Sequence, residues 1–263
     1  MNQIKAIWVY RFFILNSIKT EFQTRFARSK LGGFWMILHP VAQVAIYALV
    51  LSSVLSAKLP GIDNHYAYAI YLMAGTLAWS VFIEIIMKSL TVFVDNGNLL
   101  KKMAFPKITL LVVILGTTLI SNILLFLAIL VVFGLLGHAP TTQILWLPML
   151  TTLVLALSIG LGLLLGVMNV FIRDIGQVTP ILLQFWFWLT PIVYTIDMLP
   201  AYYKMFFMIN PMTSIVQAYQ SILVYGTSPN LSSLIYPSLL SLFLLSLSLF
   251  VFMKANEEMA DVL

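Results

Sequence analysis

Six long runs of apolar, nearly uncharged residues constrain this chain more than any other feature of its sequence. A helix needs about 20 apolar residues to cross a bilayer core of about 30 Å. Backbone groups in lipid must find hydrogen-bond partners within the protein, so these runs predict helices and not strands. The predicted fold is an all-α, polytopic membrane protein with six transmembrane helices, at about 34–57, 66–87, 108–136, 144–172, 175–196 and 234–253.

The composition excludes most other classes of protein. Of the 263 residues, 61% are hydrophobic and 9% are charged, whereas about a quarter of the residues are charged in soluble domains. So few charges cannot cover a water-soluble globule, which excludes a soluble enzyme, a disordered chain and a nucleic-acid-binding protein. The absence of Cys excludes a disulfide framework, a thiol nucleophile and a Cys-ligated metal.

The basic residues lie almost entirely on one side of the predicted membrane domain. Of the 14 Lys and Arg residues, only Lys58 and Lys204 fall in segments that six spans place on the opposite side. The positive-inside rule makes the basic side cytoplasmic, with both termini inside. We therefore expect one domain over 1–263, with a cytoplasmic interface helix at 1–33, a membrane region at 34–253 and a cytoplasmic tail at 254–263.

The N-terminal segment has the periodicity of an amphipathic helix. Apolar residues recur at helical spacing with polar residues between them, namely Ile4, Trp8, Phe12, Leu15, Phe22 and Phe26. This pattern favours a helix that lies in the cytoplasmic interface. A simple membrane anchor remains the alternative.

Several sites that would identify another class of transporter are missing from the sequence. No G-x-x-x-x-G-K-[ST] loop occurs, so this chain does not bind ATP by that route. His39, His65 and His138 are far apart in sequence, so no metal site is expected. Glu84 is the one carboxylate inside a predicted span, and Lys88 follows one helical turn later, which predicts an ion pair near the interface. A single paired acid is weak support for a proton-coupled carrier.

The loop between the second and third spans, DNGNLLKKMAFPKITL at 95–110, predicts a short cytoplasmic helix. Asp95 or Asn96 is placed to cap this helix, and Pro106 prevents it from continuing into the next span. The helix would have an apolar face and a basic face, formed by Leu99, Leu100, Lys101 and Lys102. Its functional interpretation is a docking helix for a soluble partner, and the alternative is a plain turn.

A cluster of three cations, Arg25, Arg28 and Lys30, precedes the first span. Cations beside a membrane entry point can hold the phosphates of a lipid headgroup. The same residues would also serve as ordinary topology determinants, and the sequence favours neither interpretation.

Aromatic residues gather around the fifth span and the segment after it. Pro180 and Pro191 interrupt this span, and Pro191, Pro200 and Pro211 bound stretches that are too short to cross a membrane. Sugar rings stack well on aromatic faces, which suits the exit of a carbohydrate conduit. An aromatic belt at the membrane surface is the alternative.

A ridge of small residues occurs in the fourth span, where Ser158, Gly162 and Gly166 recur at intervals of four. Such ridges allow helices in membranes to approach closely. We therefore expect structural packing along this face.

Taken together, these segments resemble the ATP-binding-cassette type 2 permease family, in particular its polysaccharide-export branch. That branch exports lipid-linked O-antigen, capsular polysaccharide and teichoic acid. The resemblance covers nearly the whole chain in the right order. It is carried by RFARSKLGGFWMILHP at 25–40, NLLKKMAFPK at 98–107, Arg173–Asp174, Thr190 with PIVY at 191–194, and Asn210–Pro211.

The resemblance implies a homodimer of permease chains in the bacterial inner membrane, paired with two separate ATPase subunits. ATP and Mg²⁺ would then be bound by the partner, so this chain would have no cofactor and would not itself be an enzyme. The expected function is export of an undecaprenyl-diphosphate-linked polysaccharide, most simply an O-antigen. The alternatives are a permease for capsular polysaccharide, teichoic acid, a small drug or a lipid, and, in another class, an ion-coupled secondary carrier.

The resemblance also implies roles for particular residues. Short extracytoplasmic gate helices would lie between Ile196 and Pro211, and the lipid diphosphate would lie near Arg25, Arg28 and Lys30. The coupling helix that contacts the ATPase would include Asn98, Leu99, Leu100, Lys101, Lys102, Phe105 and Pro106. The aromatic residues of the glycan conduit and gate would include Trp35, Tyr47, Phe185, Trp188, Tyr194, Tyr202 and Tyr203.

Overall fold

The computed structural model of the chain describes residues 8–26, 34–35, 38, 41–42, 67–102, 106–198, 200–256 and 258–262. These residues form helices and turns, with no β-strand among them, so the predicted all-α class is confirmed. The longer helices are α2 (Arg11–Phe26), α4 (Ala67–Asp95), α6 (Ile108–Leu135), α7 (Leu147–Phe171), α8 (Asp174–Trp188), α10 (Pro211–Leu223) and α11 (Leu231–Ala255). The shorter elements are α5 (Gly97–Lys102), α9 (Ala201–Ile209), α12 (Glu258–Val262) and the 3-10 helices η1 (Thr142–Trp146) and η2 (Ile196–Met198).

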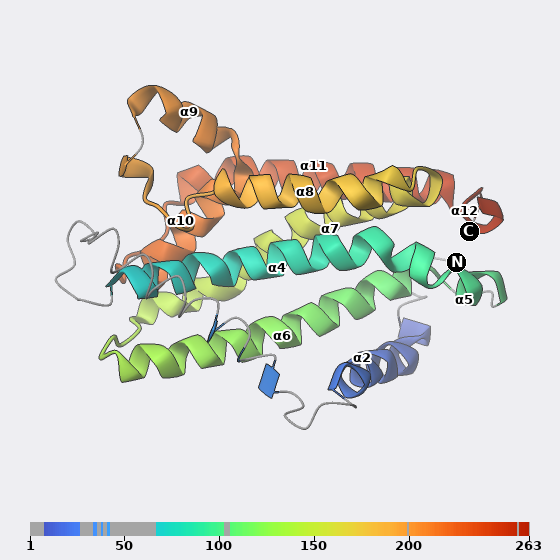
Figure 1. Ribbon diagram of the computed structural model, residues 1–263, viewed down its shortest axis with the longest axis horizontal. Helices are drawn as coiled ribbons and strands as arrows, with labels where there is room; N and C mark the ends of the chain where they lie inside the picture. Colours follow the sequence, from blue (N-terminus) through green and yellow to red (C-terminus); the bar gives the residue numbers. More distant parts are fainter. Residues whose placement is uncertain are drawn as a thin grey trace.

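Helices α4, α6, α7, α8 and α11 run side by side along the long axis of the molecule (Figure 1). α7 makes its most extensive contacts with α4 and α11. Its small residues let these helices approach closely. A Cβ added at Gly162 would lie 2.9 Å from the Cβ of Ser89 on α4, and a Cβ added at Gly166 would lie 2.3 Å from the carbonyl oxygen of Ser89. Gly160 faces α11 in the same way, and Ser158 is fully buried. The predicted packing ridge is therefore confirmed.

Four helical segments in the described part of the chain are long and apolar enough to cross a membrane. They are α4, α6, α7 together with η1, and α11, and they match the predicted second, third, fourth and sixth spans. The predicted first span at 34–57 lies almost entirely outside the described residues. The predicted fifth span at 175–196 corresponds in part to α8, which has 15 residues, ends at Trp188 and is not among the four helical segments long enough to cross a membrane. Pro180 lies inside this helix without ending it, and the backbone stops being helical before Pro191.

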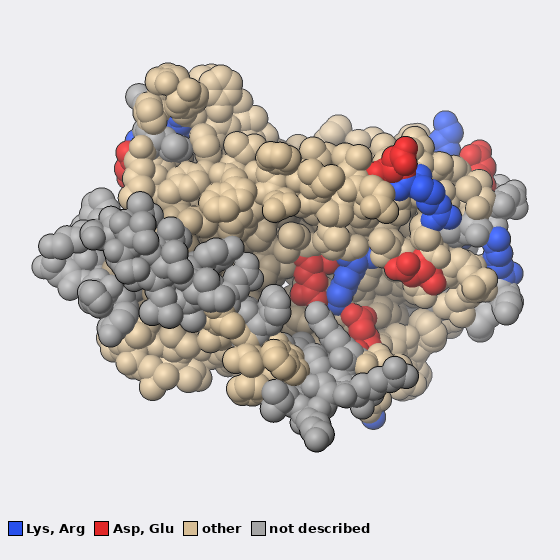
Figure 2. All heavy atoms as spheres, in the orientation of Figure 1, with Lys and Arg blue, Asp and Glu red and all other residues tan. Residues whose placement is uncertain are grey.

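The bundle has two chemically different ends. We name them after the predicted orientation: the inner end carries α5, the start of α6, the turn between α7 and α8, and α12, whereas the outer end carries α9 and the start of α11 (Figure 1). Charged side chains gather toward the inner end on the face shown in Figure 2. Lys101, Lys107, Arg173 and Lys254 belong to elements at the inner end, and Lys204 belongs to α9 at the outer end. Four of these five basic residues therefore lie at one end of the bundle, and the side of the membrane that this end faces stays a prediction.

Candidate functional site

The chain leaves the helical bundle at the outer end, between α8 and α9. Leu189 closes α8, and the backbone from Thr190 to Thr195 is not helical. Pro191 has no N–H and disfavours a helical conformation of the residue before it. The segment is nevertheless packed into the bundle, because Thr190 and Ile192 are both fully buried. Its carbonyl groups therefore need hydrogen-bond donors from elsewhere in the protein.

Side chains from two neighbouring helices supply these donors. The hydroxyl of Tyr71 on α4 donates to the Pro191 carbonyl at 3.2 Å, and the amide of Gln220 on α10 donates to the same oxygen at 3.1 Å. The hydroxyl of Tyr68, almost one turn earlier on α4, donates to the Val193 carbonyl. These contacts fix the irregular segment to the most buried part of the bundle.

Asn210 joins the end of α8 to the start of α10. Its amide donates to the Leu189 carbonyl at 3.1 Å and to the Thr190 hydroxyl at 2.9 Å. Its side-chain oxygen accepts from the Met212 backbone N–H at 3.0 Å, which caps α10, and from the Trp186 indole N–H at 2.8 Å. The Asn210–Pro211 motif was recognised in the sequence, but this bridging role was missed because it depends on contacts with a segment about twenty residues earlier.

The described members of the predicted conduit and gate aromatics lie on different elements, and their role in transport stays a prediction. Phe185 and Trp188 lie on an exposed face of α8, with 63% and 55% of their surface exposed. Tyr202 and Tyr203 lie on α9, which projects from the bundle (Figure 1). Tyr194 is held at the end of α8, where its hydroxyl donates to the Trp188 carbonyl at 2.7 Å. The structure thus groups these aromatics on separate elements of the outer half.

At the inner end, α5 forms the short helix that the loop sequence predicts. Leu100 is buried and belongs to the same core as Met259 of α12, and α5 contacts both α4 and α12. Leu99 is half-buried, whereas Asn98 and Lys101 are exposed. The helix therefore has an anchored apolar side and a free polar side.

The connections of α5 differ in one detail from the predicted cap. The amide of Asn96 donates to the Val92 carbonyl at 2.8 Å, so this side chain extends α4 instead of capping α5. Beyond α5, the Lys107 ammonium donates to the Asn256 carbonyl and ties the start of α6 to the end of α11. The start of α6 is thereby joined to the end of α11, while α5 itself contacts α4 and α12.

Lys88 holds α2 against the bundle. Its ammonium lies 3.0 Å from Glu84, which confirms the predicted ion pair. It also lies 2.7 Å from Glu21 of α2 and 2.9 Å from the hydroxyl of Thr117 on α6. The contact with Glu21 was not predicted, because α2 and α4 are separated by about forty residues and only the tertiary structure brings them together.

α2 is apolar on two faces. Trp8, Phe12 and Leu15 form the exposed stripe that the sequence predicts, with Trp8 exposed at 70%. Ile14 is buried and Ile18 is half-buried, on a second face that contacts α6. α2 therefore packs on a protein neighbour as well as exposing apolar side chains, and its place in the cytoplasmic interface stays a prediction.

Several predicted residues fall at or beyond the limits of the described chain. Trp35 is described and exposed, and Pro106 is half-buried at the start of α6. The side chains outside the described residues are those of Arg25, Arg28, Lys30, Tyr47, Lys102 and Phe105. Among the described residues, no group of three or more His, Asp or Glu side chains is placed to hold a metal. The Nε2 atom of His138 is hydrogen-bonded to the Leu223 carbonyl oxygen at 2.7 Å, which is a structural contact.

Comparison with known proteins places the chain in a family. The model of the ABC-2 type transporter family matches residues 14–224. The chain is 25% identical over 261 residues to an O-antigen export system permease protein, RfbA, of Myxococcus xanthus, with 98% of each chain covered. It is 24% identical to an RfbA of Klebsiella pneumoniae, with 92% of each covered, and 26% identical to the polysialic acid transport protein KpsM of Escherichia coli, with 91% of this chain and 92% of that protein covered. The chain is a multi-pass membrane protein that belongs to the ABC-2 type transporter family.

Proposed function

We propose that this chain is the permease subunit of an ABC exporter that moves a lipid-linked polysaccharide out of the cytoplasm, with ATP hydrolysed on a separate subunit. The observation that carries this proposal is the similarity to O-antigen export permeases along almost the full length of both chains. An O-antigen linked to undecaprenyl diphosphate is the cargo we propose first, and capsular polysaccharide or teichoic acid is the alternative within the same branch.

The functional unit is a homodimer of six-helix chains in the inner membrane, with two ATPase subunits on the cytoplasmic side. α5 is the coupling helix in this proposal. Its exposed Asn98 and Lys101 offer a polar surface to the ATPase, while Leu100 anchors it to α12 and the end of α4. When nucleotide closes the ATPases, a displacement of α5 would therefore move the end of α4 and α12 directly, because α5 is packed against both.

The cargo enters at the inner end and leaves at the outer end. Arg25, Arg28 and Lys30 would hold the lipid diphosphate at the inner membrane surface. The aromatics Trp35, Tyr47, Phe185, Trp188 and Tyr194 would offer stacking surfaces to successive sugars, because weak and repeated contacts suit a moving polymer. η2 and α9, with Tyr202 and Tyr203, act as gate helices at the exit, and the position of α9 at the outer end supports this role.

The experiment is reconstitution of the chain in liposomes with and without an ABC ATPase subunit from the same organism. Export of an undecaprenyl-diphosphate-linked O-antigen is expected only with both proteins, ATP and Mg²⁺. Uphill export by this chain alone would favour an ion-coupled carrier. Export of a drug or a plain lipid in place of the glycan would favour the other type 2 permeases.

A further inference from the structure

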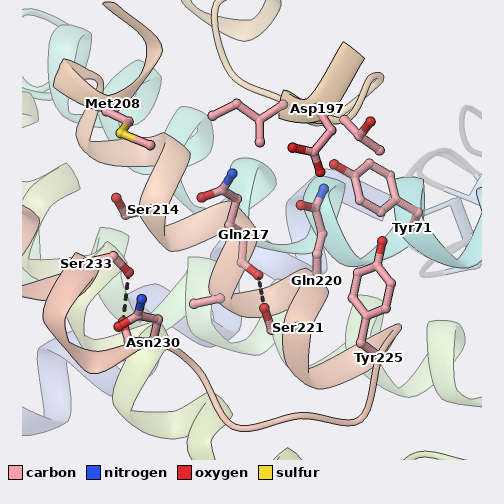
Figure 3. A pocket seen from close by; sticks show the side chains of 13 residues that line it. Tyr71, Asp197, Met208, Ser214, Gln217, Gln220, Ser221, Tyr225, Asn230 and Ser233 are labelled. Carbon is pink, nitrogen blue, oxygen red and sulfur yellow. Dashed lines mark hydrogen bonds between the residues drawn. The ribbon is translucent and has the colours of Figure 1, made fainter. Parts of the chain in front are cut away.

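A polar cavity of about 350 Å³ lies at the outer end, apart from the exposed aromatics discussed above. It is bordered by the segment that follows Pro191, by α10 and by the start of α11, and one residue of α4 also lines it (Figure 3). Ligand-binding pockets commonly have volumes of roughly 300 to 1,000 Å³. The cavity is at the small end of this range, which suits a single small molecule or one unit of a chain.

One wall of the cavity is rigid. Tyr71 and Gln220 both line it, and both donate to the Pro191 carbonyl, at 3.2 and 3.1 Å. The Tyr71 hydroxyl also lies 3.1 Å from the Tyr194 carbonyl. These two side chains are held by the buried irregular segment, so the wall is fixed before any ligand arrives, which lowers the entropic cost of binding.

Three other polar side chains of the cavity are available to a ligand. The amide of Gln217 and the hydroxyls of Ser214 and Tyr225 make no hydrogen bond to any residue that the structure describes. The Asn230 oxygen caps α11 through the Ser232 backbone N–H at 3.1 Å. In Figure 3 the Gln217 side chain points into the same space that Gln220 and Asp197 border. The cavity therefore presents both donors and acceptors without a partner in this part of the chain.

The charge of the described lining disfavours anionic ligands. Among the described residues that line the cavity, Asp197 is the only one with a charged side chain, and its carboxylate is paired with Lys204 at 3.0 Å. Lys204 does not line the cavity, so the described lining offers an acidic ligand a carboxylate and no cation. Burial and then the charge of Asp197 raise the pKa of the Tyr225 phenol, which remains a neutral hydrogen-bond donor at physiological pH.

We infer that this cavity binds one uncharged sugar unit of the exported glycan as it leaves the membrane. A pyranose ring carries several hydroxyls, each both donor and acceptor, which match the amides and hydroxyls of the lining, while Tyr71 and Tyr225 contribute aromatic surface. A lipid tail would leave these polar groups unpaired, and an acidic sugar would face Asp197. The inference rests on the proposed function and narrows its cargo to a glycan with neutral sugars at the units that the cavity contacts.

The test uses the full-length chain in lipid nanodiscs and saturation-transfer NMR. The neutral probes are the methyl glycosides of glucose, galactose, mannose and N-acetylglucosamine, and the acidic probe is the methyl glycoside of N-acetylneuraminic acid. At least one neutral probe is expected to bind, and the acidic probe is not. Gln217→Ala and, separately, Tyr225→Phe should each raise the dissociation constant about fivefold, since each removes one hydrogen bond.

Gln177→Ala is the matched control, because this exposed glutamine lies in the first turn of α8 at the inner end. It should leave binding unchanged. The inference is wrong if no neutral probe binds, if the acidic probe binds equally well, or if both cavity variants bind like Gln177→Ala. ATP-driven glycan export by a wild-type chain that binds no probe would overturn the sugar site and leave the proposed function intact. Sugar binding without such export would support the site and overturn the proposed function.

Discussion

The centre of α7 and the segment from Thr190 to Thr195 are both buried, but they are stabilised in different ways. α7 satisfies its own backbone hydrogen bonds, so its neighbours need only fit its shape, and glycines bring them close. The segment after α8 is not helical, so its carbonyls depend on side chains of α4 and α10. A helix in a membrane is therefore sensitive to side-chain volume, whereas an irregular segment is sensitive to the loss of a donor.

The largest expected effect comes from filling the contact between α7 and α4. Gly166→Leu would force a side chain against the Ser89 carbonyl, which already lies 2.3 Å from an ideal Cβ. We expect a loss of at least about 3 kcal/mol in the free energy of unfolding, or failure to assemble. Thermal unfolding and gel filtration in detergent would measure it.

The matched control for this substitution is Gly134→Leu on α6, where no atom lies within 4 Å of an added Cβ. This change should be neutral or stabilise the helix by up to about 1 kcal/mol. Equal effects of the two substitutions would show that close packing of α7 is not what holds the bundle together.

The second effect tests the dependence of the irregular segment on donated hydrogen bonds. Asn210→Ala removes the cap of α10 and three hydrogen bonds, to Trp186, Leu189 and Thr190. The free energy of unfolding should therefore fall by about 2 kcal/mol, as measured by thermal unfolding. Asn230→Ala removes the cap of α11 and a contact with Ser232, and should cost about 1 kcal/mol. If the two alanine variants unfold at the same temperature, the bridge from Asn210 to α8 contributes nothing.

A smaller effect is expected where α2 joins the bundle. Glu21→Gln removes the ion pair between Glu21 and Lys88 but leaves Lys88 paired with Glu84. Because the Glu21–Lys88 pair is partly exposed, the free energy of unfolding should fall by about 0.5 to 1 kcal/mol, and the effect should shrink at high salt. Glu258→Gln, at an exposed position of α12, is the control and should have no measurable effect. A Glu21 effect that does not depend on salt would contradict the electrostatic explanation.

The smallest effect on stability, but a large effect on transport, is expected on the free side of α5. The double substitution Lys101→Glu with Lys102→Glu should change the free energy of unfolding by less than about 0.5 kcal/mol. It should nevertheless uncouple ATP hydrolysis from glycan export in reconstituted vesicles. Lys254→Glu on the last turn of α11 is the control. Normal coupling in the double variant would remove α5 from the proposed contact with the ATPase.

Much of this arrangement was predictable from local sequence. The apolar runs predicted four of the helices, the spacing of Glu84 and Lys88 predicted their ion pair, and the glycine ridge predicted close packing. Each of these depends on residues within a few turns of one another. The two apolar faces of α2 were not predicted, because the sequence does not say that α6 covers one of them.

The sequence by itself determined that this chain is an all-helical membrane protein, because bilayer thickness and the cost of unpaired backbone groups restrict what apolar runs can form. Only the tertiary structure decided where α8 ends, which donors satisfy the backbone around Pro191, and how a polar cavity arises at the outer end. These features join residues of α4, α8, α10 and α11, and hydrogen bonds between distant residues leave no periodic pattern along the chain.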